Sequence, residues 1–168
     1  SVKAGVGSAL KHFPGYGNNA DTHTGIAVDK RSADTFRASD FLPFKAGIDA
    51  GCGIVMVSHN IVECFDKENP ASLSAEVHRV LREELSFDGV ITTDDLAMQA
   101  ITDSYGSGEA AVLAIEAGND LICCSDLSVK YEAVKSAYES GRISLSRIEE
   151  SVLRILEYKV TMGLLSSD

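Results

Sequence analysis

The sequence predicts an α/β fold in which parallel strands alternate with helices. Four short apolar runs recur along the chain, each bounded by glycine or polar residues. They are continuous rather than alternating, which is typical of strands buried on both faces. Helical patterns separate them, and this alternation indicates parallel strands joined by right-handed crossovers. The four predicted strands are "VGSALKHF" (6–13), "GIVMVSHN" (53–60), "GVITTDDL" (89–96) and "DLICCS" (120–125).

The first two predicted helices fill the gaps between the first three strands. Residues 32–51 carry a helical pattern that we expect to be broken at Pro43 and to stop at Gly51. Residues 74–87 form the second helix, with Ser74 as its N-cap. Its apolar stripe, which should face the sheet, consists of Val77, Val80, Leu81 and Leu85.

Three further helical patterns complete the chain. Residues 107–118 form a small, apolar helix that ends at Gly118, and residues 129–141 form another that ends at Gly141. The last helix opens with a capping box, Ser146–Glu149. The residues of this helix that we expect to point inward are Ile148, Val152, Ile155 and Leu156.

Polar side chains at the ends of successive strands favour a barrel. The alternation alone fits either a doubly wound sheet or part of a (β/α)-barrel. Barrels collect catalytic residues from several strand ends, and a complete (β/α)₈ TIM-type barrel takes about 250 residues. Four βα units therefore make half of one, and with no linker in sight we expect residues 1–168 to form a single half-barrel domain. The strand-end pairs are Lys11 and His12, Ser58 and His59, and Asp94 and Asp95.

Composition excludes several classes of partner. The chain has 168 residues and a formal net charge of −10, so it lacks the basic surface that nucleic acid or an anionic membrane requires. No apolar run approaches the roughly 18 residues that span a bilayer. The four cysteines form no CxxC pair, and we expect buried, reduced thiols, which favours the cytoplasm without settling the compartment.

Asp94 and Asp95 are the strongest candidates for chemistry at a strand end. Neighbouring side chains on a strand point to opposite sides, so only one of the two carboxylates should face the barrel mouth. That carboxylate could attack an electrophilic carbon or bind a metal. The alternative is that both aspartates cap the following helix.

The glycine-rich loop after the first strand holds a second candidate, the pair Asp21 and His23. A carboxylate beside an imidazole fixes its tautomer and suits a group that first donates and then accepts a proton. An Asx-turn with an exposed histidine is the alternative. Lys11 and His12 could donate to sugar or carboxylate oxygens, or be ordinary strand-end residues.

Two further histidines are weaker candidates than the loop pair. His59 ends a strand and could be structural, and His78 lies in a helical pattern and is expected at the surface.

Five segments together identify a family. "KHFPGYGNNADTH", "FLPFKAGIDAG", "IVMVSH", "LREELSFDGVITTDDLAM" and "EAAVLAIEAGNDLI" resemble glycoside hydrolase family 3, and its bacterial β-N-acetylhexosaminidases most of all. The resemblance implies a (β/α)₈ barrel and retaining hydrolysis of a saccharide that contains N-acetylglucosamine, with no metal or organic cofactor.

The resemblance also assigns roles to residues. It implies that Asp94 is the nucleophile and that His23, held by Asp21, is the acid/base. It makes Lys11 and His12 ligands of the sugar hydroxyls. It places His59 in the lining of the same pocket.

Two departures from the family pattern stand out. Tyr16 occupies a position where a histidine is common. The chain also starts at what resembles the fifth barrel strand, so the N-terminal half of the barrel is absent and the implied activity does not extend to these 168 residues alone. We expect either a fragment of a longer enzyme or a chain that completes its barrel as a homodimer or with a separate first half.

Two other functions fit parts of the pattern. A metal-dependent hydrolase could use Asp21, His23, His59 and Asp94 as ligands, which elemental analysis would reveal. A non-catalytic half-barrel interaction module would show no turnover even with the missing half. Within the family a β-glucosidase is the alternative, although the Asp21–His23 loop favours an N-acetylated sugar.

Overall fold

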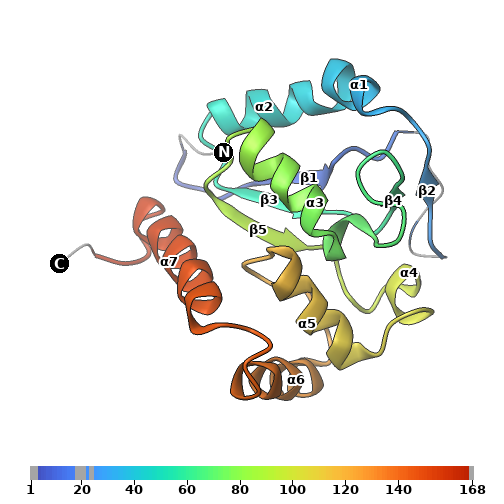
Figure 1. Ribbon diagram of the computed structural model, residues 1–168. Coiled ribbons are helices and arrows are strands. Elements are labelled where there is room, and N and C mark those ends of the chain that lie inside the picture. The colour runs from blue at the N-terminus through green and yellow to red at the C-terminus, as the bar shows by residue number, and fades with distance from the viewer. Residues whose placement is uncertain (1–3, 18–21, 23–24, 167–168) are drawn as a thin grey trace.

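A computed structural model of the chain describes residues 4–17, 22 and 25–166 (Figure 1). In this part of the chain, a parallel sheet has the order β1-β3-β5. The strands are β1 (Ala9–Phe13), β3 (Ile54–Val57) and β5 (Val90–Thr93). The parallel α/β prediction is therefore confirmed.

The fourth predicted strand is reduced to a single contact. Leu121 forms an isolated parallel bridge with Thr92 of β5, and the next residues leave the sheet. A second, two-stranded parallel sheet pairs β2 (Val28–Asp29) with β4 (Ile61–Val62). Elements of two residues are too short to show a periodicity, so sequence patterns do not predict them.

The first helical segment is continuous through Pro43. It consists of α1 (Ala33–Thr35), the π-helical turn η3 (Phe36–Asp40) and α2 (Phe41–Asp49). The predicted break at Pro43 is wrong. The π turn ends just before α2, so the proline falls in the first turn of α2, where a missing N–H is tolerated.

The second helical segment is capped as predicted. After the 3₁₀ turn η4 (Ala71–Leu73), Ser74 Oγ accepts from Val77 N at 3.3 Å and opens α3 (Ala75–Arg79), which continues as the π-helical turn η5 (Val80–Glu84). The expected stripe is buried, at 0–3% exposure. His78 is only 3% exposed, so its predicted surface position is wrong. It faces Gly118 at the end of α5, a contact between distant segments that a helical pattern cannot reveal.

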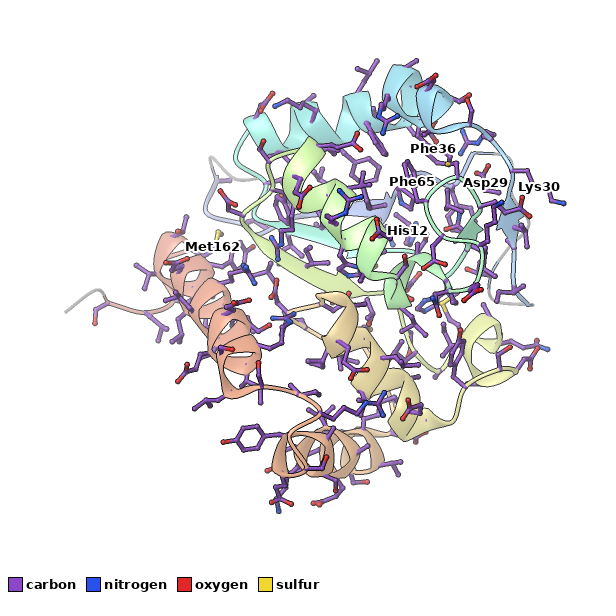
Figure 2. The ribbon with its side chains drawn as sticks, in the orientation of Figure 1. His12, Asp29, Lys30, Phe36, Phe65 and Met162 are labelled. Atoms are coloured by element: carbon purple, nitrogen blue, oxygen red, sulfur yellow. The ribbon has the colours of Figure 1, made fainter. Side chains whose placement is uncertain are left out.

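A single cluster of phenylalanines lies in the core of the first half of the molecule. Phe36 and Phe65 pack with ring centroids 5.6 Å apart (Figure 2). Phe13 packs on Phe41 and Phe44. This core lies between the sheet and the helices α2 and α3, and it supports the carboxyl ends of the strands. Buried apolar surface stabilises such a core by roughly 25 cal/mol per Å².

The remaining helices are α4 (Gln99–Thr102), α5 (Ser107–Ala117), α6 (Leu127–Glu139) and α7 (Leu145–Thr161). The predicted ends at Gly118 and Gly141 are confirmed to within one or two residues. The N-cap of α7 is Ser144, whose Oγ accepts from Arg147 N at 3.2 Å, rather than the predicted Ser146. Within the described residues, no helix is long and apolar enough to cross a membrane.

The side of helix α7 that packs against the rest of the protein differs from the predicted one. The predicted inward position of Val152 and Leu156 is wrong, because their side chains are 47% and 43% exposed. The inward face instead carries Arg147, Ser151 and Arg154, which bond to backbone and carboxylate groups beneath the helix. Local periodicity cannot show that the buried neighbour of a helix is polar, which explains the error.

Helix α7 also lies across the amino ends of the strands (Figure 1). A Cβ added at Gly7 or at Gly53, which lie before β1 and β3, would fall 2.2 or 2.6 Å from atoms of Tyr158. All four cysteines are free, as predicted, and Cys52 is buried. The predicted burial is wrong for Cys123, which is exposed because the chain leaves the sheet there.

Candidate active site

His12 and Asp94 meet at the carboxyl end of the sheet. His12 belongs to β1 and Asp94 directly follows β5, with β3 between these two strands. His12 Nε2 lies 3.4 Å from Asp94 Oδ2, and the two side chains are 28% and 19% exposed. A partly exposed carboxylate held by an imidazole can bind a cation or act as a nucleophile.

The two neighbouring aspartates have different surroundings. Asp94 N donates to Val57 O at 3.0 Å, and Asp94 Oδ1 accepts from Asp95 N at 2.9 Å, which leaves Oδ2 facing His12. Asp95 Oδ1 accepts from Ala97 N at 2.9 Å and closes the following turn. Asp95 thus closes a turn, and neither aspartate caps the following helix α4 (Gln99–Thr102), whose N-cap is Met98.

His59 lies beneath the Asp94–Asp95 turn. Its side chain is 0% exposed, Nδ1 lies 2.7 Å from Ser72 Oγ and Nε2 lies 3.0 Å from Asp95 O. Burial lowers the pKa of His59, so the ring is neutral near pH 7. Because a carbonyl can only accept, Nε2–H donates to Asp95 O and the hydroxyl of Ser72 donates to Nδ1. His59 therefore holds the Asp94–Asp95 turn through its bond to Asp95 O. Direct contact of His59 with a substrate stays a prediction.

Lys11 lies beside His12 in β1 but on the side of α2. It is exposed, and it lines a cavity of about 100 Å³ together with Leu10, Pro43 and Phe44. The structure brings His12 and Asp94 together and leaves Lys11 at the open edge of the sheet. Its binding of sugar hydroxyls stays a prediction.

Asp21 and His23 lie outside the described residues, but the structure describes Thr22 between them. Thr22 is 1% exposed, its N–H donates to Tyr16 Oη at 3.0 Å, and its hydroxyl also bonds to Tyr16 Oη. The ring of Tyr16 stands edge-on to the ring of His12, with centroids 5.7 Å apart. Tyr16 therefore ties the loop to the site. Sequence reasoning noted it only as a departure from a family pattern.

Sequence reasoning missed an ion-pair network that lies beside Gly15 and Gly17. Arg31 donates to both oxygens of Asp29 and, through Nη1, to Asp40 Oδ2 at 2.9 Å, and these bonds raise the pKa of its guanidinium. A Cβ at Gly15, whose φ is +131°, would lie 2.2 Å from Asp40 Oδ1. Only glycine fits there. Asp29 ends the two-residue strand β2 and Arg31 follows two positions later, and so short a strand does not attract notice in the sequence.

The described residues contain no group of three or more His, Cys, Asp or Glu side chains that could hold a metal ion. The metal hypothesis also needs Asp21 and His23, which lie outside this part of the chain. Both ring nitrogens of His59 already have protein partners, so His59 is a poor fourth ligand.

Comparison with known proteins decides the family. Residues 2–158 match the family described as Glycosyl hydrolase family 3 N terminal domain. The chain belongs to glycosyl hydrolase family 3. The resemblance read from the sequence motifs is thereby confirmed.

Relatives within family 3 are named as hexosaminidases. A Beta-hexosaminidase of Stenotrophomonas maltophilia is 43% identical over 128 residues, and one of Xanthomonas campestris pv. campestris is 39% identical over 127 residues. These matches cover 73% and 74% of this chain, which spans only 38% of each relative.

A solved family 3 structure has the same fold. The β-N-acetylglucosaminidase of Paenibacillus sp. str. FPU-7 superposes with a TM-score of 0.92 and 36% identity, over 98% of this chain and 34% of that one.

Proposed function

We propose that this chain forms the C-terminal half of the (β/α)₈ barrel of a retaining β-N-acetylhexosaminidase. The observation that carries the proposal is the contact of His12 with the Asp94 carboxylate at the carboxyl end of a parallel sheet, in a family 3 chain. Barrel enzymes place their catalytic groups at this end. The names of the relatives favour an N-acetylated hexosamine as the sugar.

The proposed chemistry has two steps. Asp94 attacks the anomeric carbon while the glycosidic C–O bond breaks, and His23 gives its proton to the departing oxygen. Water then attacks the same carbon, His23 takes the water proton, and the Asp94 carboxylate is released with the free sugar. His23 with Asp21 replaces the second carboxylate of most glycosidases, so the carboxylate-separation rule does not apply.

Neighbouring side chains would support these steps. His12 lies on Asp94 Oδ2 and stabilises the ionised carboxylate, while His59 holds the turn that aims it. Lys11 and His12 would donate to sugar hydroxyls. Tyr16 would hold the loop of Asp21 and His23 close to His12 through its bonds to Thr22.

The other half of the barrel would come from a preceding chain segment, a separate chain or a second copy. Strand β1 lies at the edge of the described sheet, and the opposite edge ends at the Leu121 bridge. An apolar cavity of about 240 Å³ lies beside Leu121, lined in part by Leu127, Tyr131 and Val134. Such surfaces favour a partner that covers them.

Substitution of each aspartate tests the function, in a protein that carries both halves of the barrel. Asp94→Asn should abolish labelling by a mechanism-based fluorinated N-acetylglucosaminide and lower turnover roughly a thousandfold or more, because the nucleophile is lost.

Asp95→Asn is the matched control. Its amide oxygen can still accept from Ala97 N, so labelling should persist. Normal labelling of the Asp94→Asn protein, or a label found on Asp95, contradicts the assignment. Absence of turnover with both halves present favours a non-catalytic module instead.

A further inference from the structure

Arg31 joins two carboxylates that come from different segments of the chain. Its Nε and Nη2 donate to Asp29 Oδ2 at 3.0 and 2.8 Å, and its Nη1 donates to Asp40 Oδ2 at 2.9 Å. Asp29 ends β2, whereas Asp40 ends the π-helical turn η3. The planar guanidinium can bond to both carboxylates at once in a fixed geometry, which a lysine ammonium does not reproduce. We call these three residues the Arg31 bridge.

The Arg31 bridge packs on the phenylalanine core. Arg31 Cζ lies 4.3 Å from the centroid of the Phe36 ring, and Phe36 is 0% exposed. A guanidinium over an aromatic ring is attracted by the negative face of that ring. Asp40 directly precedes Phe41, whose ring stacks on that of Phe13 in β1 with centroids 5.5 Å apart. Both Arg31 and Asp40 are therefore held by close-packed groups, which give the bridge a fixed position.

The turn after β1 lies against the Arg31 bridge at two glycines. A Cβ added at Gly15 would fall 2.2 Å from Asp40 Oδ1, and one added at Gly17 would fall 2.8 Å from Arg31 Cζ. Their φ angles are +131° and +54°, in the region that favours glycine. The backbone on each side of Tyr16 is therefore in close contact with a residue of the bridge.

Tyr16, between these two glycines, connects the turn to the candidate active site. Gly15 N donates to His12 O at 3.0 Å and closes the turn onto β1. The ring of Tyr16 stands edge-on to the ring of His12, with centroids 5.7 Å apart. His12 Nε2 in turn lies 3.4 Å from Asp94 Oδ2. Because the Tyr16 ring limits the rotation of the imidazole, the position of the turn affects the contact of His12 with Asp94.

We propose that Arg31 and Asp40 are positioning residues for the His12–Asp94 pair, through the turn and Tyr16. The inference rests on the proposed function, in which Asp94 attacks the sugar. A misplacement of about 1 Å caused far from the chemistry can lower a rate on the order of a hundredfold. Loss of the bridge should therefore lower kcat and leave KM nearly unchanged, because the ligands of the bound sugar stay in place.

Replacement of Arg31 tests the proposal in a protein that carries both halves of the barrel. Arg31→Lys keeps the charge and removes the planar fork. We expect kcat for an aryl N-acetylglucosaminide to fall by about tenfold to a hundredfold, while KM changes by less than about threefold.

Replacement of Asp40 gives a second, independent test of the bridge. Asp40→Ala removes the acceptor of Arg31 Nη1, so kcat should fall by about tenfold or more. Asp40→Asn keeps an acceptor oxygen, and its kcat should stay within about threefold of that of the parent.

NMR of the same proteins reports the position of His12 without turnover. The edge-on rings of Tyr16 and His12 should give nuclear Overhauser contacts in the parent. These contacts should weaken in Arg31→Lys and in Asp40→Ala. If the parent shows no turnover, the proposed function fails, and the NMR contacts still decide whether the bridge positions His12.

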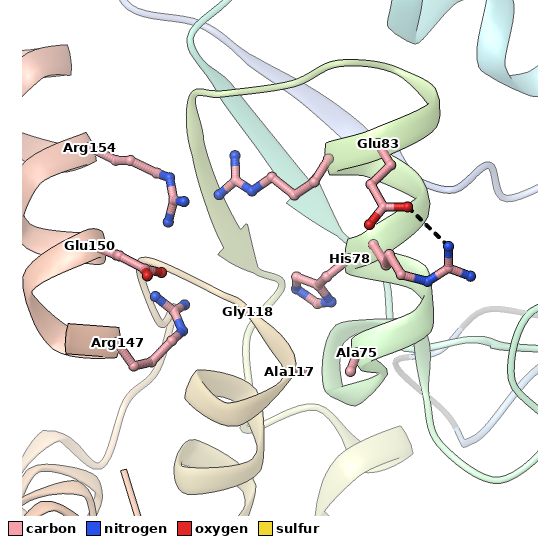
Figure 3. Close-up of a pocket in the computed structure, with 10 residues that line it drawn as sticks. Ala75, His78, Glu83, Ala117, Gly118, Arg147, Glu150 and Arg154 are labelled. Atoms are coloured by element: carbon pink, nitrogen blue, oxygen red, sulfur yellow. Dashed lines mark hydrogen bonds and ion pairs between the residues drawn. The ribbon is translucent and has the colours of Figure 1, made fainter. Parts of the chain in front are cut away.

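Arg154→Lys is the matched control at the other end of the sheet. Arg154 extends from α7, which lies across the amino ends of the strands (Figure 3). It pairs with the buried Asp120 at 3.1 Å, and its side chain is 27% exposed against 31% for Arg31. The same substitution there should lower stability toward urea and leave kcat and the Tyr16–His12 contacts unchanged.

Three results would overturn the proposal. Arg31→Lys and Asp40→Ala proteins with the kcat and the NMR contacts of the parent would show that the bridge only joins β2 to η3. Unchanged Tyr16–His12 contacts in variants with a lowered kcat would exclude the path through Tyr16. An equal fall of kcat in Arg154→Lys would show that the loss reflects stability alone.

Discussion

Buried histidines act in this protein by being neutral. His59 and His78 are 0% and 3% exposed, and burial lowers the pKa of both rings. Each neutral ring donates to one backbone carbonyl, from Nε2 of His59 to Asp95 and from Nδ1 of His78 to Ser74. His59, which bonds to Asp95 O in the turn after Asp94, is therefore shielded from solvent and is still sensitive to protonation.

This neutrality predicts a loss of stability in mild acid. In the unfolded chain histidine has a pKa of about 6.5, so the unfolded state binds more protons than the folded state below that pH. The stabilisation is fully present above the unfolded pKa and is lost as the pH falls through it toward the folded values. Urea unfolding should give a lower free energy of unfolding at pH 5.5 than at 7.5.

NMR titration supplies the control for this prediction. The ring signals of His59 and His78 should stay those of a neutral imidazole below pH 6.5. Ordinary titration of both rings near 6.5 would contradict the argument.

At the scale of an element, helix α7 differs from the sequence prediction in its N-cap and in its inward face. Ser144 and Ser146 both stand where a cap is reasonable, and Ser144 Oγ accepts from Arg147 N. Arg147 and Ser151 are four positions apart and so lie on one side of α7, where Ser151 donates to Asp120 Oδ1 at 2.8 Å. Helix α7 therefore begins at the Ser144 cap and turns a polar face toward the protein.

Replacement of each serine tests the cap. Ser144→Ala should lower the free energy of unfolding by about 1 kcal/mol, because an N–H of the first turn loses its partner. Ser146→Ala, two positions later, should change it by less than about 0.5 kcal/mol. Chemical denaturation of the two variants beside the parent measures both values, and a larger effect at Ser146 would show that the cap lies there.

At the scale of the whole molecule, several large apolar side chains are exposed to solvent. Val152, Leu153 and Leu156 of α7 are 43–56% exposed, and Leu127 of α6 is 70% exposed. Burial of such a side chain contributes roughly 1.5–3 kcal/mol, which for several residues approaches the 5–15 kcal/mol stability of a domain. A chain with these surfaces should be stabilised by a partner.

The isolated residues 1–168 should therefore self-associate, most simply as a twofold dimer, at micromolar concentration. Light scattering measures the mass, and addition of the first barrel half as a separate chain should convert the dimer to a one-to-one complex. A compact monomer that unfolds cooperatively and binds no apolar dye would contradict this prediction.

Local patterns in the sequence determined the α/β class, the Ser74 cap, the buried stripe that runs through α3 and η5 to Leu85, and the family motifs. These depend on residues within a few positions of one another, where periodicity and capping act. The strand-end rule also predicted that Asp94 and His12 lie at the same end of the sheet, since parallel strands share one carboxyl edge. The neutral state of His59, by contrast, comes from its burial, and the partners of its two ring nitrogens, Ser72 and Asp95, lie far apart in the chain.

Only the tertiary structure decided which polar groups are buried together. Asp120 gathers Arg82 from η5 and Arg147, Ser151 and Arg154 from α7, and this cluster turned the apolar side of α7 outward. A buried carboxylate loses its hydration and is stable only where donors converge on it, so the fold must satisfy it with whatever elements lie near. Asp120 is 38 positions from Arg82 and 31 from Ser151. Periodicity describes one element at a time, so it cannot predict such a convergence.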